Sequence, residues 1–313
     1  MQRPERFGSL ALGGAMPASL LPTCKRNFTK YAMEYTLLNN GVRMPMLGYG
    51  VFLVSPEECE RCVLDAIRVG YRHIDTAQAY ANEAGVGSAM RKSGLPRDEF
   101  FITTKVWLTN AGEERAAASI EKSLRLLQTD YIDLLLVHQA YGDYYGTWRA
   151  MERALAAGKV RALGVSNFQA CRFLDFALNV DVKPAVNQLQ CNPVMQQVGI
   201  EPLLAEFGTK NMAWGPLGQG DASVVANPEL TAIGAKYGKT ASQVALRWLL
   251  QRDIVAIPKS SHVERMQENF DIFSFRLTDE DMARIATLNV HDEGTRNYND
   301  PAFLRYLRGR FDI

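Results

Sequence analysis

The sequence has no excess of charge of either sign and no apolar run long enough to span a bilayer. Its 313 residues contain 35 Lys and Arg against 34 Asp and Glu, which gives a formal net charge of +1. Such a balance offers no electrostatic basis for binding nucleic acid or an anionic membrane surface. We therefore expect a protein that binds neither, and we further expect a cytoplasmic monomer or weak homo-oligomer.

Cysteine is also scarce, and its five scattered positions do not form the disulfide framework of a secreted protein. Cys59 and Cys62 make a C-x-x-C pair, a pattern found in redox and zinc sites. They follow a helix start at Ser55 and Pro56, however, and share one face of that helix with apolar residues. This arrangement favours core packing over redox chemistry. Zinc would need further Cys or His ligands, so we predict no metal site.

Residues 1–33 differ in pattern from the rest of the chain. They carry Arg3 and Arg6, then a weakly apolar stretch over Leu10–Leu21 that Gly and Pro interrupt. A secretory signal has a similar outline, but no small-x-small cleavage site follows. We favour a disordered extension or a mis-assigned start codon over an export signal, and we expect a single domain over residues 34–313.

Neither G-x-G-x-x-G nor a Walker A loop occurs, so a Rossmann or P-loop nucleotide site has no support. Asn-Gly at positions 40 and 41 predicts a hairpin over residues 35–46. Short apolar runs then alternate with amphipathic helical stretches. The expected strands are Met46–Tyr49, Arg72–Ile74, Phe100–Lys105, Ile132–Val137, Val160–Gly164, Ala185–Leu189, Met212–Trp214 and Ile254–Ile257, and the expected helices lie near 56–69, 82–93, 113–127, 145–157, 168–177, 199–207 and 240–252. Eight such units predict an α/β fold, a (β/α)8 TIM barrel with an N-terminal β-hairpin.

Function in such a barrel lies at the mouth formed by the C-terminal ends of the strands. The expected second, third and fourth strands end at Asp75, Lys105 and His138, and Tyr80 lies in the loop after the second strand. Each residue alone has an ordinary structural explanation, as a helix cap, a solvated charge, a core histidine or a packed ring. Their coincidence at one mouth indicates a catalytic site.

These four residues suit the reduction of a carbonyl group. The carbonyl oxygen needs a proton donor as hydride reaches the carbon, and a phenol with its ordinary pKa of about 10 donates reluctantly. A neighbouring Lys⁺ lowers that pKa, a carboxylate keeps the lysine charged, and a histidine orients the carbonyl. We therefore predict four roles: acid/base for Tyr80, its modulator for Lys105, the lysine's partner for Asp75 and the orienter for His138.

Several long motifs carry a resemblance to a known family. They are Gly70–Ala77 with Tyr80, Asn82, Glu83 and Gly87; Phe101–Trp107; Gly158–Phe168; and Ile257–Ser260 followed by Arg265, Glu268 and Asn269. In this order they resemble the aldo-keto reductases over about residues 35–290. The resemblance implies a (β/α)8 barrel, a catalytic tetrad made of the four residues above, and hydride transfer between NADP(H) and a small carbonyl or alcohol.

The resemblance also implies a cofactor site. The nicotinamide would be held by hydroxyl and amide groups on its carboxamide and by a stacked aromatic ring, which assigns Ser166, Asn167, Gln188 and Trp214. Leu217 is a further expected cofactor-binding residue. The adenosine 2′-phosphate and the adenine would be held by Lys259, Ser260, Arg265, Glu268 and Asn269. Fixed positive charges at the start of a helix suit a phosphate, which favours NADP(H) over NAD(H).

Departures from the family pattern concern the substrate pocket. Phe52 and Gln139 stand at positions where many relatives carry tryptophan. We expect Phe52 and Trp107 to form apolar walls, with Tyr49 as a further candidate, and Gln139 to make one wall more polar. The tail over residues 289–313 also diverges, and we expect it to shape the pocket opening.

Two other functions stay open at this point. A chain that binds NADP(H) as a sensor with negligible turnover has no need of the tyrosine, lysine and aspartate together. A barrel glycosidase needs two carboxylates flanking the bond that it cleaves, whereas the fourth and seventh strands here end in His138 and Trp214. The residues favour an NADP(H)-dependent oxidoreductase that reduces aldehydes or ketones, small-molecule carbonyl substrates, to alcohols.

Overall fold

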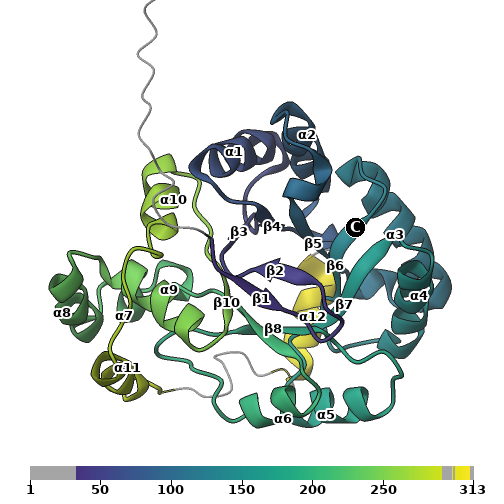
Figure 1. Ribbon diagram of the computed structural model, residues 1–313. Helices are drawn as coiled ribbons and strands as arrows, with labels where there is room; N and C mark the ends of the chain where they lie inside the picture. Colours follow the sequence, from purple (N-terminus) through teal and green to yellow (C-terminus); the bar gives the residue numbers. More distant parts are fainter. Residues whose placement is uncertain (1–32, 291–297, 299, 311–313) are drawn as a thin grey trace, which may run out of the picture.

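Eight parallel strands form the centre of the computed structural model, which describes residues 33–290, 298 and 300–310 (Figure 1). They follow chain order around the sheet: β3 (Gly48–Gly50), β4 (His73–Asp75), β5 (Phe101–Val106), β6 (Ile132–Val137), β7 (Val160–Ser166), β8 (Val186–Gln190), β9 (Lys210–Trp214) and β10 (Val255–Ile257). β5 to β8 are buried along nearly their whole length, as expected for strands covered on both faces. The predicted (β/α)8 barrel is confirmed.

The first and last strands meet at a junction that we call the seam. Ala256 N donates to Met46 O at 2.9 Å, and Gly50 N donates to Pro258 O at 3.0 Å. Leu47 also pairs with Ala256 in a parallel bridge. The seam thus joins β3 to β10 and closes the barrel.

Helices surround the strands (Figure 1). Seven match predicted helices: α1 (Pro56–Val69), α2 (Glu83–Lys92), α3 (Glu113–Leu127), α4 (Tyr144–Ala156), α5 (Ala170–Leu178), α6 (Glu201–Glu206) and α9 (Ala241–Gln251). Further helices are α7 (Ala222–Val225), α8 (Pro228–Tyr237), α10 (Val263–Phe270), α11 (Asp279–Ala286) and α12 (Pro301–Arg310), with 3₁₀ turns η1 (Gln78–Tyr80), η2 (Arg97–Glu99), η3 (Leu108–Asn110) and η4 (Gly218–Gly220). Across the described residues, no helix has the length and apolar character needed to cross a membrane.

Several predicted boundaries are wrong by two residues, including the end of β7, the start of β9 and the two starts described next. The helix expected from residue 168 begins at Ala170, because Asn167 has a left-handed φ of 63° and Gln169 stays extended. Phe168, between them, is fully buried. The first barrel strand runs over Gly48–Gly50, two residues later than expected at its start.

The start of α1 follows its sequence signals. Ser55 is the N-cap and its side chain accepts a hydrogen bond from Glu58 N, while Pro56 is the first helical residue. Cys59 and Cys62 are free and fully buried, which confirms the packing interpretation. Burial raises the pKa of the Cys59 thiol to about 12, so it stays protonated and unreactive near neutral pH.

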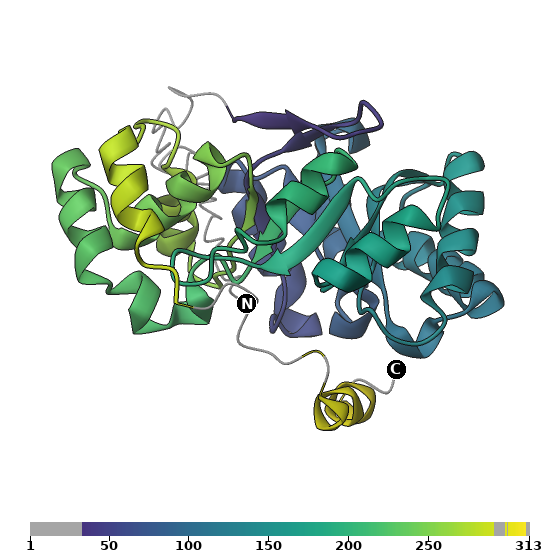
Figure 2. The ribbon, with the colours of Figure 1, turned by 90° about the horizontal axis from the view of Figure 1, so that it is seen from below.

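The two ends of the barrel are covered by different segments (Figure 2). The predicted hairpin, β1 (Tyr35–Leu37) and β2 (Arg43–Pro45), lies across one end, where Met44 packs against strand residues inside the barrel. α12 lies at the opposite end, where Leu307 packs against Trp107 and Ala79. The extension predicted over residues 1–33 falls outside the described residues apart from Met33.

Candidate active site

A pocket of about 930 Å³ opens where the strands end at the α12 side of the barrel. It is lined by every residue predicted for catalysis, cofactor binding or the substrate wall except Lys105: Phe52, Asp75, Tyr80, Trp107, His138, Gln139, Ser166, Asn167, Gln188, Trp214, Leu217, Lys259, Ser260, Arg265, Glu268 and Asn269. Lys105 is fully buried next to Asp75 and Tyr80. Tyr49, the further candidate for a wall, does not line the pocket.

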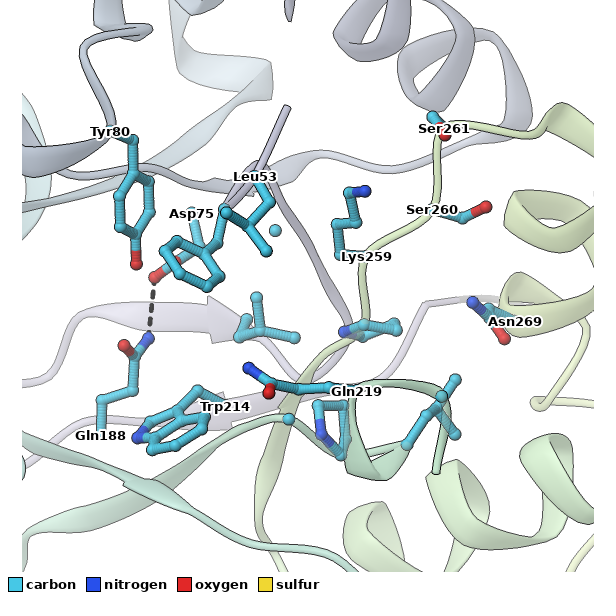
Figure 3. Close-up of a pocket in the computed structure, with 18 of the residues that line it drawn as sticks. Leu53, Asp75, Tyr80, Gln188, Trp214, Gln219, Lys259, Ser260, Ser261 and Asn269 are labelled. Carbon is cyan, nitrogen blue, oxygen red and sulfur yellow. Dashed lines mark hydrogen bonds between the residues drawn. The ribbon is translucent and has the colours of Figure 1, made fainter. Parts of the chain in front are cut away.

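The pocket has two chemically distinct ends (Figure 3). Tyr80, Asp75, Gln188 and Trp214 gather at one end. Ser260, Ser261 and Asn269 lie at the other, and the side chains of Lys259 and Gln219 lie between the two groups. Two separate groups of polar side chains in one pocket suit an elongated ligand.

Tyr80 is presented by a single 3₁₀ turn that a buried asparagine holds in place. η1 ends at Tyr80, and Ala81 after it has a left-handed φ of 55°. Asn82 donates to the carbonyls of Val51 and Val54, both at 3.0 Å, and accepts from Thr76 Oγ1 at 2.8 Å. This network fixes the loop after β4 against the loop after β3.

Lys105 contacts two other members of the predicted tetrad, Asp75 and Tyr80. From β5, its Nζ lies 2.6 Å from Asp75 Oδ1 at the end of β4 and 3.5 Å from Tyr80 Oη. It also donates to the carbonyl of Thr76 at 2.8 Å. The ammonium group thus has three oxygen neighbours and no contact with solvent, because the side chain is fully buried.

The charges at this end of the pocket follow from burial and from the ion pair. Burial is the largest single influence and lowers the pKa of Lys105, but the charges of Asp75 and Tyr80 and the hydrogen bonds to them together outweigh it, so the pKa of Lys105 is raised. Burial lowers the pKa of His138 well below its usual value, and the charge of Lys105 lowers it further. His138 is therefore neutral near pH 7, with its ring edge against Tyr80 and Trp107 at centroid distances of 5.7 and 4.9 Å.

Three polar side chains, Ser166, Asn167 and Gln188, line the pocket beside the tetrad. Ser166 ends β7, and its Oγ donates to Gln188 O of β8 at 3.0 Å. Gln188 Nε2 donates to Asp75 Oδ2 at 2.8 Å. Asn167 Nδ2 donates to His138 O at 3.1 Å, and Asn167 Oδ1 accepts from Trp214 Nε1 at 2.9 Å. The predicted carboxamide-binding groups and the predicted stacking ring therefore form one connected network.

The pocket lining also carries positive charge. Lys259 and Arg265 are exposed, and within residues 33–290, 298 and 300–310 neither forms an ion pair. Arg265 lies in the first turn of α10, whose N-cap residue His262 provides no side-chain cap. Ser260 Oγ accepts from His262 N at 3.1 Å. Free cations beside an uncapped helix start form a favourable site for an anion.

The side chains predicted for the substrate wall surround the tetrad. The Phe52 ring packs on Tyr80 at a centroid distance of 5.1 Å, and Trp107 is buried against His138. Gln139 is 6% exposed, and its Oε1 has no hydrogen-bond partner among the described residues. An unpaired amide in this position favours a ligand that can hydrogen-bond to it.

Several pocket residues escaped the sequence analysis. Leu53 and Gln219 both line the pocket from left-handed backbone, with φ values of 59° and 58°. Leu307 of α12 adds an apolar wall, which confirms that the tail shapes the pocket. Gln78 accepts from the backbone of Trp107 at 3.0 Å and so holds that wall in place. The positive φ of Leu53 and Gln219 leaves no sequence signal, because both are residues that rarely adopt it.

No group of three His, Cys, Asp or Glu side chains able to hold a metal ion occurs in the part of the chain that the structure describes.

Comparison with known proteins identifies the family. A model of the aldo/keto reductase family matches residues 47–290. Glyoxal reductase of Bacillus subtilis is 44% identical over 290 residues, which are 92% of this chain and 100% of that protein. Morphine 6-dehydrogenase of Pseudomonas putida is 42% identical over 281 residues, covering 84% of this chain and 93% of its own length. A solved aldo/keto reductase from Brucella melitensis matches with a TM-score of 0.80 and 37% identity over 82% of this chain and 100% of that structure. The chain therefore belongs to the aldo/keto reductase family.

Proposed function

We propose that this oxidoreductase reduces small aldehydes and ketones with NADPH, and that Tyr80 is the proton donor. The observation that supports it most strongly is the position of Lys105. A buried ammonium held by Asp75 lies within 3.5 Å of a pocket-lining phenol. A barrel that used Tyr80 only for packing would have no reason to bury a charge beside its hydroxyl.

The pocket fits a nicotinamide dinucleotide phosphate. Its volume is near the upper end of the usual range of about 300–1,000 Å³, enough for a long ligand. Trp214 offers a flat face beside the amides of Asn167 and Gln188. Lys259 and Arg265, which form no ion pair within the described residues, line the same pocket. These cations match the extra phosphate that distinguishes NADPH from NADH. When bound, NADPH supplies the hydride.

Within this proposal each tetrad residue handles the proton or the carbonyl. Tyr80 gives its hydroxyl proton to the carbonyl oxygen as the carbonyl carbon receives hydride, so that an alcohol forms and a phenolate remains. The Lys105 charge stabilises that phenolate, and Asp75 keeps Lys105 charged. His138 is neutral, so it orients the carbonyl oxygen by hydrogen bonding without protonating it.

The substrate is proposed to be small and to carry a second oxygen. Phe52, Trp107 and Leu307 limit the space around Tyr80 with apolar walls. The unpaired amide of Gln139 lies in the same wall and provides a polar contact. A short dicarbonyl or hydroxyaldehyde satisfies both features, and the similarity to a protein named glyoxal reductase agrees with this choice.

The test compares wild type with Tyr80→Phe on a panel of small aldehydes, ketones and dicarbonyls. NADPH consumption is followed by its absorbance, and NADPH binding to each protein is measured separately by fluorescence. We expect wild type to turn over and Tyr80→Phe to bind NADPH equally while losing on the order of 10²–10⁴-fold in kcat. Trp107→Phe serves as a control for changes in pocket shape that leave the phenol in place.

Two results would overturn the proposal. If both proteins bind NADPH and neither reduces any carbonyl of the panel, the chain is an NADPH-binding sensor. If Tyr80→Phe keeps most of the wild-type kcat, the proton comes from another group.

A further inference from the structure

Lys259 stands on backbone that is fixed on both sides. The carbonyl of Pro258, just before it, accepts from Gly50 N at 3.0 Å. The carbonyl of Ser260, just after it, accepts from the hydroxyl of Tyr49 at 2.6 Å. Both donors belong to β3, so two neighbouring residues of the first strand hold the residues that flank Lys259 across the seam.

Tyr49 reaches Ser260 from behind the pocket wall. It is 1% exposed, its ring packs on Tyr71 at a centroid distance of 5.7 Å, and it does not line the pocket. Burial raises the pKa of its phenol above the ordinary value, so the hydroxyl remains a donor at any pH at which the protein works. Tyr49 can therefore affect a bound ligand only through the loop that it holds.

We propose that Tyr49 is a positioning residue for cofactor choice, which holds Lys259 and Ser260 where they meet the adenosine 2′-phosphate. The inference rests on the proposed use of NADPH. It assigns to a buried tyrosine outside the pocket a contribution to the preference for the phosphorylated cofactor.

The physical reason lies in the loop between β10 and α10. The Pro258 carbonyl is held by a backbone N–H that no side-chain change removes, whereas the Ser260 carbonyl depends on one phenol. Ser260 in turn accepts from His262 N and so fixes the approach to α10. Without the phenol, the backbone that carries the exposed Lys259 side chain is held less firmly. The ammonium group then spends less time at the position that suits a phosphate.

The experiment measures the contribution of the 2′-phosphate alone. Calorimetry gives the Kd values of 2′-phospho-ADP-ribose and of ADP-ribose for wild type, Tyr49→Phe and Tyr145→Phe, with no turnover required. Tyr145→Phe is the matched control, because its hydroxyl donates to Asp175 on α5, away from the pocket. Circular dichroism checks that each variant is folded.

We define the phosphate preference as the Kd of ADP-ribose divided by the Kd of 2′-phospho-ADP-ribose. We expect Tyr49→Phe to reduce this ratio by about three- to ten-fold, the effect of one hydrogen bond, while the Kd of ADP-ribose stays unchanged. Tyr145→Phe should leave the ratio at its wild-type value. In a Lys259→Met background the Tyr49→Phe change should have little further effect on the ratio, because both act on the same charge.

The outcomes separate this inference from the proposed function. If wild type binds both ligands equally, the proposed preference for NADPH is wrong. If wild type prefers the phosphorylated ligand and Tyr49→Phe keeps the full ratio, the positioning role is wrong. Equal weakening of both ligands, or full additivity with Lys259→Met, would also overturn it, since either shows a general effect on the pocket.

Discussion

Gln188 donates a hydrogen bond of 2.8 Å to Asp75 Oδ2, across the barrel mouth from β8 to β4. The other oxygen of Asp75 pairs with Lys105 at 2.6 Å. One carboxylate thus links a residue predicted to hold the nicotinamide carboxamide to the lysine beside the proposed proton donor. Under the proposed function, cofactor binding and proton transfer would therefore share this carboxylate.

This contact predicts that Gln188→Leu impairs both steps. Asp75 would keep Lys105 but lose the donor to its second oxygen in a buried site, which costs about ten-fold in an equilibrium or rate. We expect kcat to fall and the Kd of NADPH to rise by roughly that factor each. A variant that changed only one of the two would show that the link is not functional.

Gln188→Glu gives the same contact a pH dependence. A second carboxylate at 2.8 Å from Asp75 cannot ionise freely, so the pKa of the pair is raised. Below that pKa the new side chain is protonated and can donate to Asp75, whereas above it the two charges repel. The ratio of variant to wild-type activity should therefore rise as the pH falls from about 8 to about 6. A ratio independent of pH would contradict this.

The Gln139 amide predicts that its removal shifts substrate preference from carbonyls with a second oxygen to apolar aldehydes. Gln139→Leu removes a buried polar group whose Oε1 has no partner among the described residues. We expect kcat/KM for an apolar aldehyde such as hexanal to rise by about five-fold, and that for glyoxal or glyceraldehyde to fall by a similar factor. Steady-state kinetics with both substrate classes on the same variant provide an internal control. Parallel changes for the two classes would exclude a direct contact with the second oxygen.

His73 makes stability depend on pH. It is fully buried beside Thr103, and burial lowers its pKa to about 3. The unfolded chain takes up this proton below about pH 6.5, while the folded chain excludes it until about pH 3, so acid favours unfolding. The free energy of unfolding should fall by about 1.4 kcal/mol per pH unit in that window on account of this group.

Urea unfolding between pH 7.5 and 4.5 measures this slope. His73→Gln should reduce the slope by the equivalent of about one proton, even if the variant is less stable at pH 7.5. Equal slopes for the two proteins would show that His73 titrates normally in the folded state.

Gly87 allows α2 to approach the end of α3. A methyl group there would lie 2.6 Å from the backbone of Leu126 and Leu127, which cannot move as a flexible side chain would. We expect Gly87→Ala to lower the free energy of unfolding by about 2 kcal/mol. Gly309→Ala, where nothing lies within 4 Å, is the control and should cause no loss. Denaturant titrations of both variants measure the free energy of unfolding. An unchanged value for Gly87→Ala would show that α2 and α3 can move apart at little cost.

The strands and the position of the tetrad could be predicted because their signals are local. Asp75 ends β4, Lys105 lies one residue before the end of β5 and His138 directly follows β6, and parallel strands bring these ends to one mouth. The first residue of α5 was harder to predict, because the positive φ of Asn167 delays the start of the helix. Asparagine is only one of several residues that permit a positive φ, so its presence alone does not predict one.

Contacts between distant segments could not be predicted in the same way. The tail has no periodic relation to the barrel, so nothing in its pattern selects Leu307 as a pocket residue. The tyrosine at position 49 suggested a pocket wall, yet its ring faces Tyr71 and its hydroxyl meets a carbonyl 211 residues away. Such a pairing depends on how two strands are placed in the closed barrel, which the residue type alone does not determine.

The contacts that hold the two parts of the site differ greatly in the length of chain that they close. The tetrad comes from three consecutive strands, and its central contact joins residues 30 positions apart. The loop of Lys259 and Ser260 is held by a contact between residues 211 positions apart. Closing so long a stretch costs more chain entropy, and contacts of this range form late. We therefore expect the tetrad residues to come together before the barrel closes, at a stage when the loop of Lys259 and Ser260 is not yet held in place.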